Sequence, residues 1–252
     1  FNTVGLAPEM DQALLGQHPE DPEAGETFAV WLYDGHADIG MTIRVHPQGG
    51  VTQGMATIML PGGRILNGVP ESGLVVRPDE PESPHVKYRV EEPFRRWRYR
   101  LVDLPMAETT DDAMQSGHVS YGEPSAVVSV DLQGTMVAPA WIQGSLLPEA
   151  AEAMKGPVGF WIAGRLNAGI SRGSFRYDQA LAATGTVSVD GGEATSFTGY
   201  GLRGHVRGVR KMEGFRSHTW MGAVFPETNR AFGLQCHSAH GTTGGYIFSE
   251  AY

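Results

Sequence analysis

Apolar and polar residues alternate in short runs along most of the chain. Glu26–Tyr33 (ETFAVWLY) and Asp38–His46 (DIGMTIRVH) are typical of strands, and the DGHA segment between them predicts a hairpin turn. In Phe94–Asp103 (FRRWRYRLVD) arginines alternate with aromatic and aliphatic residues. Similar runs, separated by Gly- and Pro-containing turns, continue to the last residues. This rhythm predicts an all-β, antiparallel protein rather than βαβ units.

Only one window has a good helical pattern. It is Gly144–Pro157 (GSLLPEAAEAMKGP), where Pro148 suits the first turn of a helix and Gly156 suits its end. We interpret this window as a connector helix. It would divide the chain into an amino-terminal β domain, residues 1–143, and a carboxy-terminal β domain, residues 158–252.

Composition narrows the classes of function. The 252 residues carry a net charge of −9, which disfavours nucleic-acid binding, and no apolar run is long enough for a membrane span. Cys236 is the one cysteine, so a disulfide framework is excluded and a cytoplasmic location is expected. The chain opens on Phe1 and shows no visible signal peptide. It lacks Walker, dinucleotide-binding and Gly-x-Ser-x-Gly motifs, and we expect it to work without a cofactor.

Cations gather late in this acidic chain. If Gly201–Arg210 and Phe215–Phe225 form a hairpin, His205 lies opposite Trp220, and Arg207 lies opposite His218. A second four-residue turn, Pro226–Asn229, sets a third strand beside them, with His218 opposite His237 and Trp220 opposite Gln235. One face would then carry Arg203, His205, Arg207, Arg216, His218, Trp220, Gln235 and His237.

Two interpretations of this polar face remain open. It is either the solvated side of an antiparallel sheet or the lining of a pocket. Trp220 among the polar residues favours a pocket, because an isolated exposed tryptophan is unfavourable there. A metal site is not expected: His218 and His237 supply only two ligands, and Cys236 points to the opposite face from His237.

Four motifs resemble those of a known superfamily. They are YDQ (Tyr177–Gln179), ATGTVSVDG (Ala183–Gly191), GYGLRGHVRGVR (Gly199–Arg210) and SHTWMGAVF (Ser217–Phe225). They are similar to motifs of the AttH / carotenoid hydratase (hydroxyneurosporene synthase)-like, lipocalin-like superfamily, which includes uncharacterised bacterial proteins. ETFAVWLYDGHADIGMTIRVHP also looks like the opening strands of that group.

The resemblance implies a fold and a range of activities. The fold is two tandem lipocalin-like β barrels with a deep apolar cavity. Members include hydratases that add water to a carotenoid or prenyl double bond, and relatives that assist ring closure of polyketide chains. Members usually continue further than this chain, so we expect the last strand to be completed by further residues or by another chain.

Matches to the family motif are uneven. His205, Arg203 and Arg210 match the family's histidine and arginines, whereas Gly204 stands where the family often has Asp and Arg207 where it often has Trp. Arg207 would repel a carbocation, so a carotenoid-type hydratase is disfavoured. Arginine and histidine together suit negative charge on a carbonyl or carboxylate oxygen.

We therefore expect a cofactor-independent hydratase/lyase, isomerase or cyclase acting on a hydrophobic terpenoid, steroid or polyketide-like substrate. His205 would be the general acid or base, with Asp178 or His218 as the second proton-transfer group. The predicted substrate-binding residues are Arg203 and Arg207, which orient an oxygen, Trp220, which forms an apolar wall, and Tyr177, Gln235 and His237.

Two other functions stay open. The same barrel would serve as a non-catalytic carrier of a lipophilic small molecule, in which case His205 would not matter for affinity. A third option is a structural subunit whose open final strand pairs with a partner, and a homo-oligomer is one such arrangement.

Overall fold

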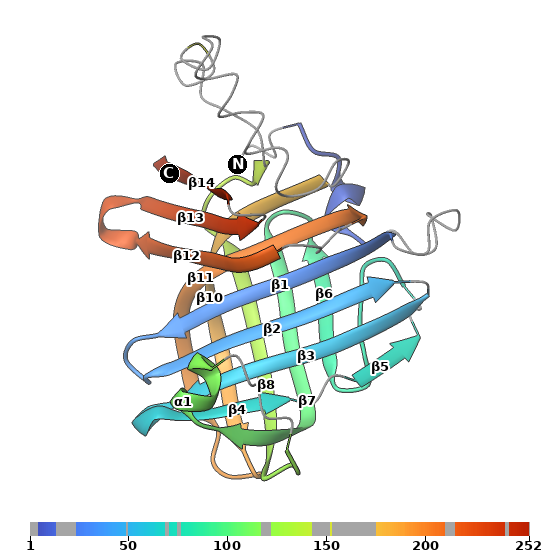
Figure 1. Cartoon of the computed structure of the whole chain (residues 1–252), viewed down its shortest axis with the longest axis vertical. Coiled ribbons are helices and arrows are strands. Elements are labelled where there is room, and N and C mark those ends of the chain that lie inside the picture. Colours follow the sequence, from blue (N-terminus) through green and yellow to red (C-terminus); the bar gives the residue numbers. More distant parts are fainter. Residues whose placement is uncertain are drawn as a thin grey trace.

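The computed structural model describes residues 5–13, 24–48, 50–68, 71–74, 77–116, 122–142, 152, 175–209, 215–239 and 242–251. These residues form an almost entirely antiparallel β protein, as the alternation predicts. Its main body is a closed barrel, and a second, smaller sheet lies beside the barrel wall (Figure 1).

Eight strands close the barrel. Their order around it is β11-β1-β2-β3-β4-β7-β8-β10, and β10 pairs back with β11 to complete the circle. Their bounds are β1 (Ala24–Asp34), β2 (Ile39–Gln48), β3 (Val51–Leu60), β4 (Arg64–Gly68), β7 (Arg96–Thr109), β8 (Ala126–Met136), β10 (Phe175–Val189) and β11 (Thr195–Val209).

Several short strands and helical turns are attached to this barrel. β5 (Glu71–Leu74) pairs with β3, β6 (Val86–Glu92) with β7, and β9 (Trp141–Ile142) with β10. The helix α1 (Asp111–Gln115) begins where the side chain of Thr110 accepts a hydrogen bond from the Ala113 N–H. Three single 3-10 turns are Pro8–Asp11, Pro61–Gly63 and Pro226–Thr228.

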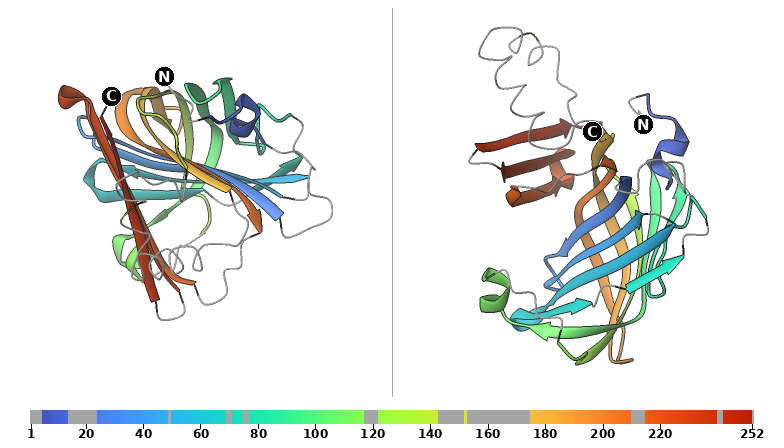
Figure 2. Two further views of the ribbon diagram at one scale, coloured as in Figure 1. Left: turned by 90° about the horizontal axis from the view of Figure 1, so that it is seen from above. Right: turned by 45° about the vertical axis from the view of Figure 1, so that its right-hand side comes forward.

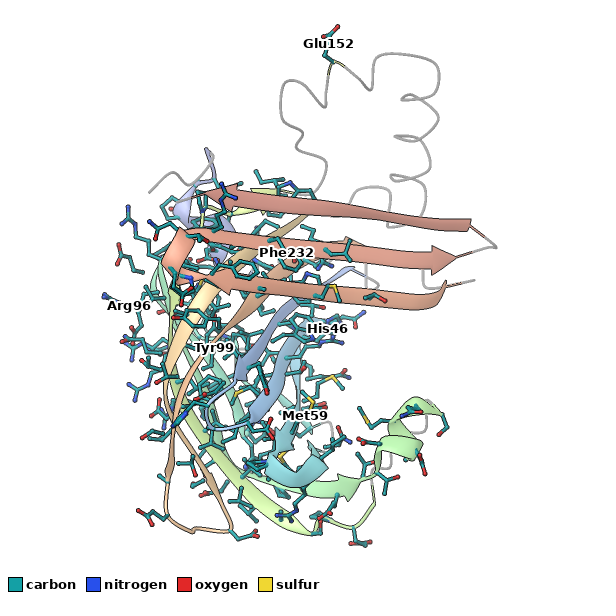
Figure 3. The ribbon with its side chains drawn as sticks, turned by 90° about the vertical axis from the view of Figure 1, so that its left-hand side faces the viewer. His46, Met59, Arg96, Tyr99, Glu152 and Phe232 are labelled. Carbon is teal, nitrogen blue, oxygen red and sulfur yellow. The ribbon has the colours of Figure 1, made fainter. Side chains whose placement is uncertain are left out.

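The barrel interior is packed with side chains. In β7, Arg96, Arg98 and Arg100 are exposed, whereas Trp97, Tyr99 and Leu101 are buried, as the sequence alternation predicts (Figure 3). Most residues of this core are aliphatic, and aromatic rings pack among them: Trp97 contacts Phe28 and Tyr88 at centroid distances of 5.6 and 5.9 Å. The inward positions of all eight strands therefore share one core.

The second sheet has three strands, β12 (Phe215–Phe225), β13 (Arg230–Ala239) and β14 (Thr242–Ala251). It forms a separate layer beside the barrel (Figure 2). Ala180 and Leu202 of the barrel wall pack with Ala231 of this sheet, and Trp220 and Val224 border the contact. Residue pairing in β12–β13 follows the predicted register, with His218 opposite His237 and Trp220 opposite Gln235.

Two sequence predictions need correction. The predicted hairpin between residues 201–210 and 215–225 does not form, because both edges of β11 are already paired, with β1 and with β10. His205 therefore lies opposite Phe28 and Tyr177 rather than opposite Trp220.

Strands β10 and β11, expected in a second barrel of residues 158–252, complete the first barrel instead, since their inward residues join its core. The predicted helix 144–157 lies outside the described residues except for Glu152.

Candidate functional site

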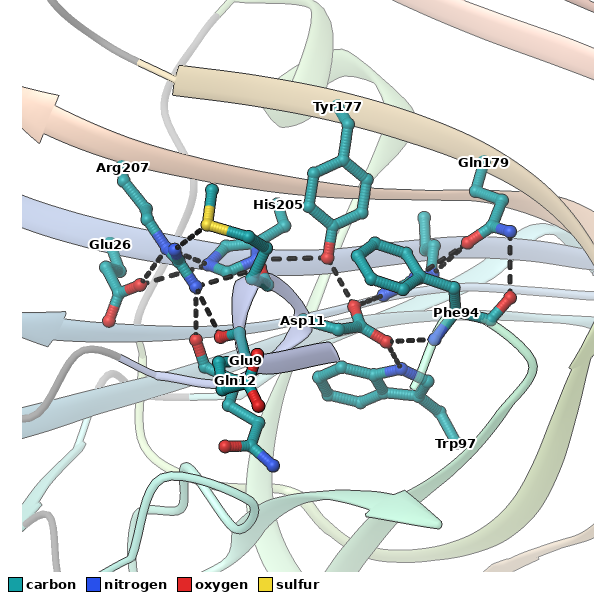
Figure 4. Close-up of polar contacts among 12 residues, drawn as sticks. Glu9, Asp11, Gln12, Glu26, Phe94, Trp97, Tyr177, Gln179, His205 and Arg207 are labelled. Atoms are coloured by element: carbon teal, nitrogen blue, oxygen red, sulfur yellow. Dashed lines mark hydrogen bonds and ion pairs between the residues drawn. The ribbon is translucent and has the colours of Figure 1, made fainter. Parts of the chain in front are cut away.

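Four of the predicted site residues meet inside one end of the barrel. Arg203, His205 and Arg207 alternate along β11, so their buried side chains share the inward face, and Tyr177 of β10 is paired with His205. Figure 4 shows the side chains of Tyr177, His205 and Arg207 together. Each side chain is at most 5% exposed. Because alternate residues of a strand share one face, Arg203, His205 and Arg207, which are two residues apart in the sequence, lie together in the structure.

His205 lies at the centre of this cluster with no exposed surface. Its Nδ1 is 3.1 Å from the Tyr177 hydroxyl, and its Nε2 is 3.1 Å from Glu26 Oε1. The ring stacks on Phe28 at a centroid distance of 3.9 Å. These side chains surround the imidazole in place of the open apolar chamber that the sequence predicts. Burial lowers the pKa of His205, against the opposing effect of Glu26, which favours a neutral ring at pH 7.

Asp11 completes the cluster from the amino-terminal segment. Its Oδ1 accepts hydrogen bonds from the Tyr177 hydroxyl and from Arg203 Nη1, the latter at 2.7 Å. Its Oδ2 accepts from the Phe94 backbone N–H at 2.5 Å and from Trp97 Nε1 at 2.8 Å. The carboxylate is fully buried, so four donors replace the water that it loses.

The two arginines are held differently. Arg203 donates twice to Gln179 Oε1, at 3.1 and 2.6 Å, and its guanidinium lies 5.1 Å from the centre of the Trp97 ring. Arg207 donates from Nε to Glu26 Oε1 at 2.7 Å and from Nη2 to the Met10 carbonyl oxygen at 2.8 Å. Arg207 therefore ties the amino-terminal segment to the barrel end.

The chain Asp11–Tyr177–His205–Glu26 has two complete proton arrangements. In one, Tyr177 donates to Asp11, His205 Nδ1–H donates to Tyr177, and Nε2 accepts from Arg207 Nε at 3.3 Å. In the other, Tyr177 donates to Nδ1 and Nε2–H donates to Glu26. Burial, followed by the charge of Asp11, raises the pKa of Tyr177, so its hydroxyl keeps a proton in both. The two arrangements differ in which ring nitrogen of His205 carries the proton and in the direction of the Tyr177 hydroxyl, so the cluster accommodates either tautomer of His205.

Asp178 and Trp220 lie on the other side of the barrel wall. Asp178 is fully buried and accepts two hydrogen bonds from Arg176, at 3.0 and 2.8 Å. The Arg176 guanidinium lies 5.3 Å from the centre of the Trp220 ring, which meets Trp31 edge-on at 3.6 Å. This junction cluster (Arg176, Asp178, Trp31 and Trp220) is separated from His205 by the β10–β11 backbone, because neighbouring residues of a strand point to opposite faces.

The junction cluster explains one departure from the family motif. A Cβ added to Gly204 would lie 2.6 Å from Asp178 Oδ1 and 3.1 Å from the Trp220 ring. An aspartate at position 204 would also bring a second carboxylate against Asp178. Glycine here thus permits the close packing of Trp220 on β11.

Other predicted residues receive no side-chain placement. His218, Gln235 and His237 lie on β12 and β13, but their side chains fall outside what the structure describes. Within the described part of the chain, no three His, Cys, Asp or Glu side chains gather closely enough to hold a metal ion. None of the described helices is long and apolar enough to cross a membrane.

Sequence reasoning missed Asp11, Glu26 and Gln179. Asp11 sits in a polar arm, 166 residues from its partner Tyr177, so no local pattern marks it. Glu26 did carry a signal. It alternates with Phe28 and Val30, both buried, and a carboxylate at an inward strand position demands a buried partner.

The lowered pKa of His205 predicts a pH dependence of stability. The unfolded chain takes up a proton near pH 6.5, whereas the folded chain resists it, so stability is retained above pH 6.5 and falls as the pH drops below it. The slope is at most about 1.4 kcal/mol per pH unit. Urea unfolding between pH 7.5 and pH 5 measures it. His205→Gln should flatten the curve, and His36→Gln, which replaces an exposed histidine, should not.

Comparison with solved structures supports the resemblance at the level of fold. A candidate AttH protein from Nitrosomonas europaea matches with a TM-score of 0.57 and 10% identity, over 92% of this chain and 66% of that chain. Kievitone hydratase from Nectria haematococca matches with a TM-score of 0.49 and 9% identity, over 90% of this chain and 61% of that chain. This chain thus spans just under two thirds of the length of these structures.

No curated protein sequence matches the chain. A family model described as a domain of unknown function, DUF7064, matches residues 11–251. The match begins at Asp11, the residue that closes the cluster, and includes every strand of both sheets. By this match, and with a lipocalin-like barrel of the AttH type as its fold, the chain belongs to the DUF7064 family.

Proposed function

We propose that this protein is a cofactor-independent acid–base enzyme of the hydratase, isomerase or cyclase type, acting on a hydrophobic small molecule. The observation that carries the proposal is the buried chain Tyr177–His205–Glu26, in which both ring nitrogens of His205 have a hydrogen-bonding partner. The sequence resemblance to carotenoid hydratases supplies the class of reaction. Terpenoid, steroid and polyketide-like compounds are the substrates that we propose, and the cytoplasm is the proposed location.

His205 acts as the general acid or base in this proposal. A neutral imidazole can take a proton from water or from an activated carbon and return it elsewhere. Tyr177 and Glu26 stabilise the imidazolium that forms, and Tyr177 replaces Asp178 and His218 as the second proton-transfer group. Asp178 does not serve the same substrate atom, because it faces the opposite side of β10.

The arginines supply the electrostatic part. When water adds to a double bond that is conjugated with a carbonyl group, negative charge develops on the carbonyl oxygen. The same happens when a proton is removed from the carbon next to a carbonyl. Arg203 and Arg207 can stabilise that charge from inside the barrel, where little water screens it. Residues 5–13 cover this end of the barrel, so the substrate reaches the arginines after the segment withdraws.

Turnover of a compound panel tests the proposal. Conjugated enones with terpenoid, steroid and polyketide-like skeletons would be incubated with the protein, and mass spectrometry would detect hydration or isomerisation. We expect His205→Gln to lower kcat by about 10²–10⁴-fold while ligand binding persists. His36→Gln, at an exposed turn, is the matched control. A folded His205→Gln variant with wild-type turnover would contradict the proposal.

The second candidate is a non-catalytic carrier of a lipophilic molecule. One observation favours it: His205 has no exposed surface and its ring stacks on Phe28 at 3.9 Å, as expected for a structural histidine. A carrier would show no turnover with any bound compound. Its affinity would be the same in wild type and in His205→Gln, whereas the enzyme would bind and convert at least one compound.

A further inference from the structure

The donors around Asp11 form an anion site that belongs to the barrel and not to the segment that fills it. We propose that these donors bind the carboxylate of a ligand, and that the Asp11 side chain occupies the site until the ligand displaces it. The inference deepens the proposed function, on which it rests, by naming a hydrophobic carboxylate as the substrate class.

The donors of the site all belong to the barrel and to the turn before β7. Its four donors come from β10, from β11 and from the start of β7 with the turn before it: the Tyr177 hydroxyl, Arg203 Nη1, Trp97 Nε1 and the Phe94 N–H. Two donors converge on each carboxylate oxygen. No donor lies on residues 5–13, so withdrawal of the segment removes none of them.

Phe94 belongs to the turn between β6 and β7. Its φ of 58° is in the left-handed region, as is common in short hairpin loops and as in Asp38, Asp190 and Asn229 of this chain. The turn holds the Phe94 N–H at 2.5 Å from Asp11 Oδ2, while the Phe94 ring packs on Tyr177 at a centroid distance of 5.4 Å. This donor is therefore fixed by the hairpin of the barrel.

The described charged side chains of this cluster are paired. Arg203 bonds Asp11, and Arg207 bonds Glu26. If Asp11 leaves alone, Arg203 stays buried without its carboxylate, which is strongly unfavourable. Another carboxylate can take the vacated position with the same hydrogen bonds.

The segment is held by contacts that a ligand can replace. Among residues 5–13, only Asp11 and Ala13 are buried. The remaining ties are polar: Arg207 Nη2 donates to the Met10 and Gln12 carbonyl oxygens, and the Ala13 N–H donates to Pro78 O at 2.8 Å. Leu6 and Met10 add partial apolar packing. A carboxylate with an apolar tail supplies both the charge and the apolar surface that the segment provides.

Chemical rescue tests the anion site. Asp11→Ala should lower the melting temperature, and acetate should raise it again in a saturable way that chloride at equal ionic strength does not reproduce. The indole ¹⁵N–¹H resonance of Trp97 should shift in step with acetate binding. Adding Arg203→Lys should weaken acetate binding by about tenfold, because the planar fork is lost. If Asp11→Ala does not fold, the decanoate titration of the wild-type protein decides the inference by itself.

Displacement is tested in the wild-type protein. Decanoate below its micelle concentration should shift the Trp97 resonance and speed amide hydrogen exchange in residues 9–13, and decanol, with the same tail and no charge, should do neither. If decanoate has no effect on wild type, Asp11 is a permanent counter-ion and the inference is wrong. It is equally wrong if acetate acts no better than chloride on the variant.

His205→Gln separates this inference from the proposed function. The variant leaves all four donors in place, so it should bind decanoate as wild type does. If His205→Gln binds decanoate and also turns over substrate as fast as wild type, the acid–base proposal alone is overturned. If His205→Gln loses turnover but decanoate has no effect on the wild-type protein, the carboxylate site alone is overturned.

Discussion

Arg203→Met is expected to lower the free energy of unfolding by about 3–5 kcal/mol, because it leaves Asp11 as a buried and uncompensated charge. Arg203 is 3% exposed and Asp11 is fully buried, so water cannot take over the role of the guanidinium. Burial opposes the charge of Arg203, but Asp11 together with Tyr177 and Tyr99 outweighs it and raises the pKa of the guanidinium. The guanidinium therefore stays charged at any pH used for the measurement.

Urea unfolding at pH 7.5 measures this loss, and two variants control it. Arg98→Ala breaks an exposed pair with Asp131 and should cost about 0–1 kcal/mol. Asp11→Leu combined with Arg203→Met removes both charges and should recover part of the loss, since an apolar pair of similar size often replaces a buried ion pair. A loss from Arg203→Met no larger than that from Arg98→Ala would show that the cluster is hydrated.

Local alternation predicts the face of a residue but not its partner strand. It correctly separates the arginines of β7 from Trp97 and Tyr99, and it places Arg203, His205 and Arg207 on one face of β11. The pairing of β11 with β1 joins residues about 180 apart, such as His205 and Phe28. The expected hairpin joined β11 to β12, the next strand in sequence, and the pairing of both β11 edges within the barrel excluded it.

The sequence also does not show which of two neighbouring strand residues points into the barrel. Tyr177 and Asp178 are neighbours, so one faces inward and the other outward, and the motif YDQ does not say which. Register decides it: Tyr177 pairs with His205, and its hydroxyl joins the interior cluster. The sequence therefore picked out Tyr177 and His205, which do meet in a polar cluster, whereas Asp178 lies on the opposite face of β10 from them.

The β10–β11 wall thus carries charged clusters on both faces. The interior cluster is closed by Asp11 and Glu26 from distant parts of the chain, and the junction cluster is closed within β10 by Arg176 and Asp178. Only one backbone layer separates them. The junction cluster lies where the second sheet packs on the barrel. Its charges should therefore affect the attachment of that sheet as well as the stability of the barrel.

Asp178→Ala is expected to destabilise the protein by about 3–5 kcal/mol, because Arg176 keeps its charge at a position that is 7% exposed. Asp178→Asn keeps the shape and one acceptor oxygen, so its loss should be smaller. The exposed Asp131→Ala, which also removes a carboxylate bonded twice by an arginine, is the matched control and should cost about 0–1 kcal/mol.

The same variants decide between structural and catalytic roles for Asp178. Asp178 bonds Arg176, whose guanidinium lies against the Trp220 ring of the second sheet, so we expect Asp178 to help hold that sheet on the barrel. Trp220 fluorescence should therefore change in Asp178→Ala at urea concentrations below the main unfolding transition, as the sheet loosens first. Turnover per folded molecule should stay near that of wild type in Asp178→Asn. A fully folded Asp178→Asn variant with turnover lowered as far as in His205→Gln would instead place the chemistry at the junction cluster, on the outer face of the wall.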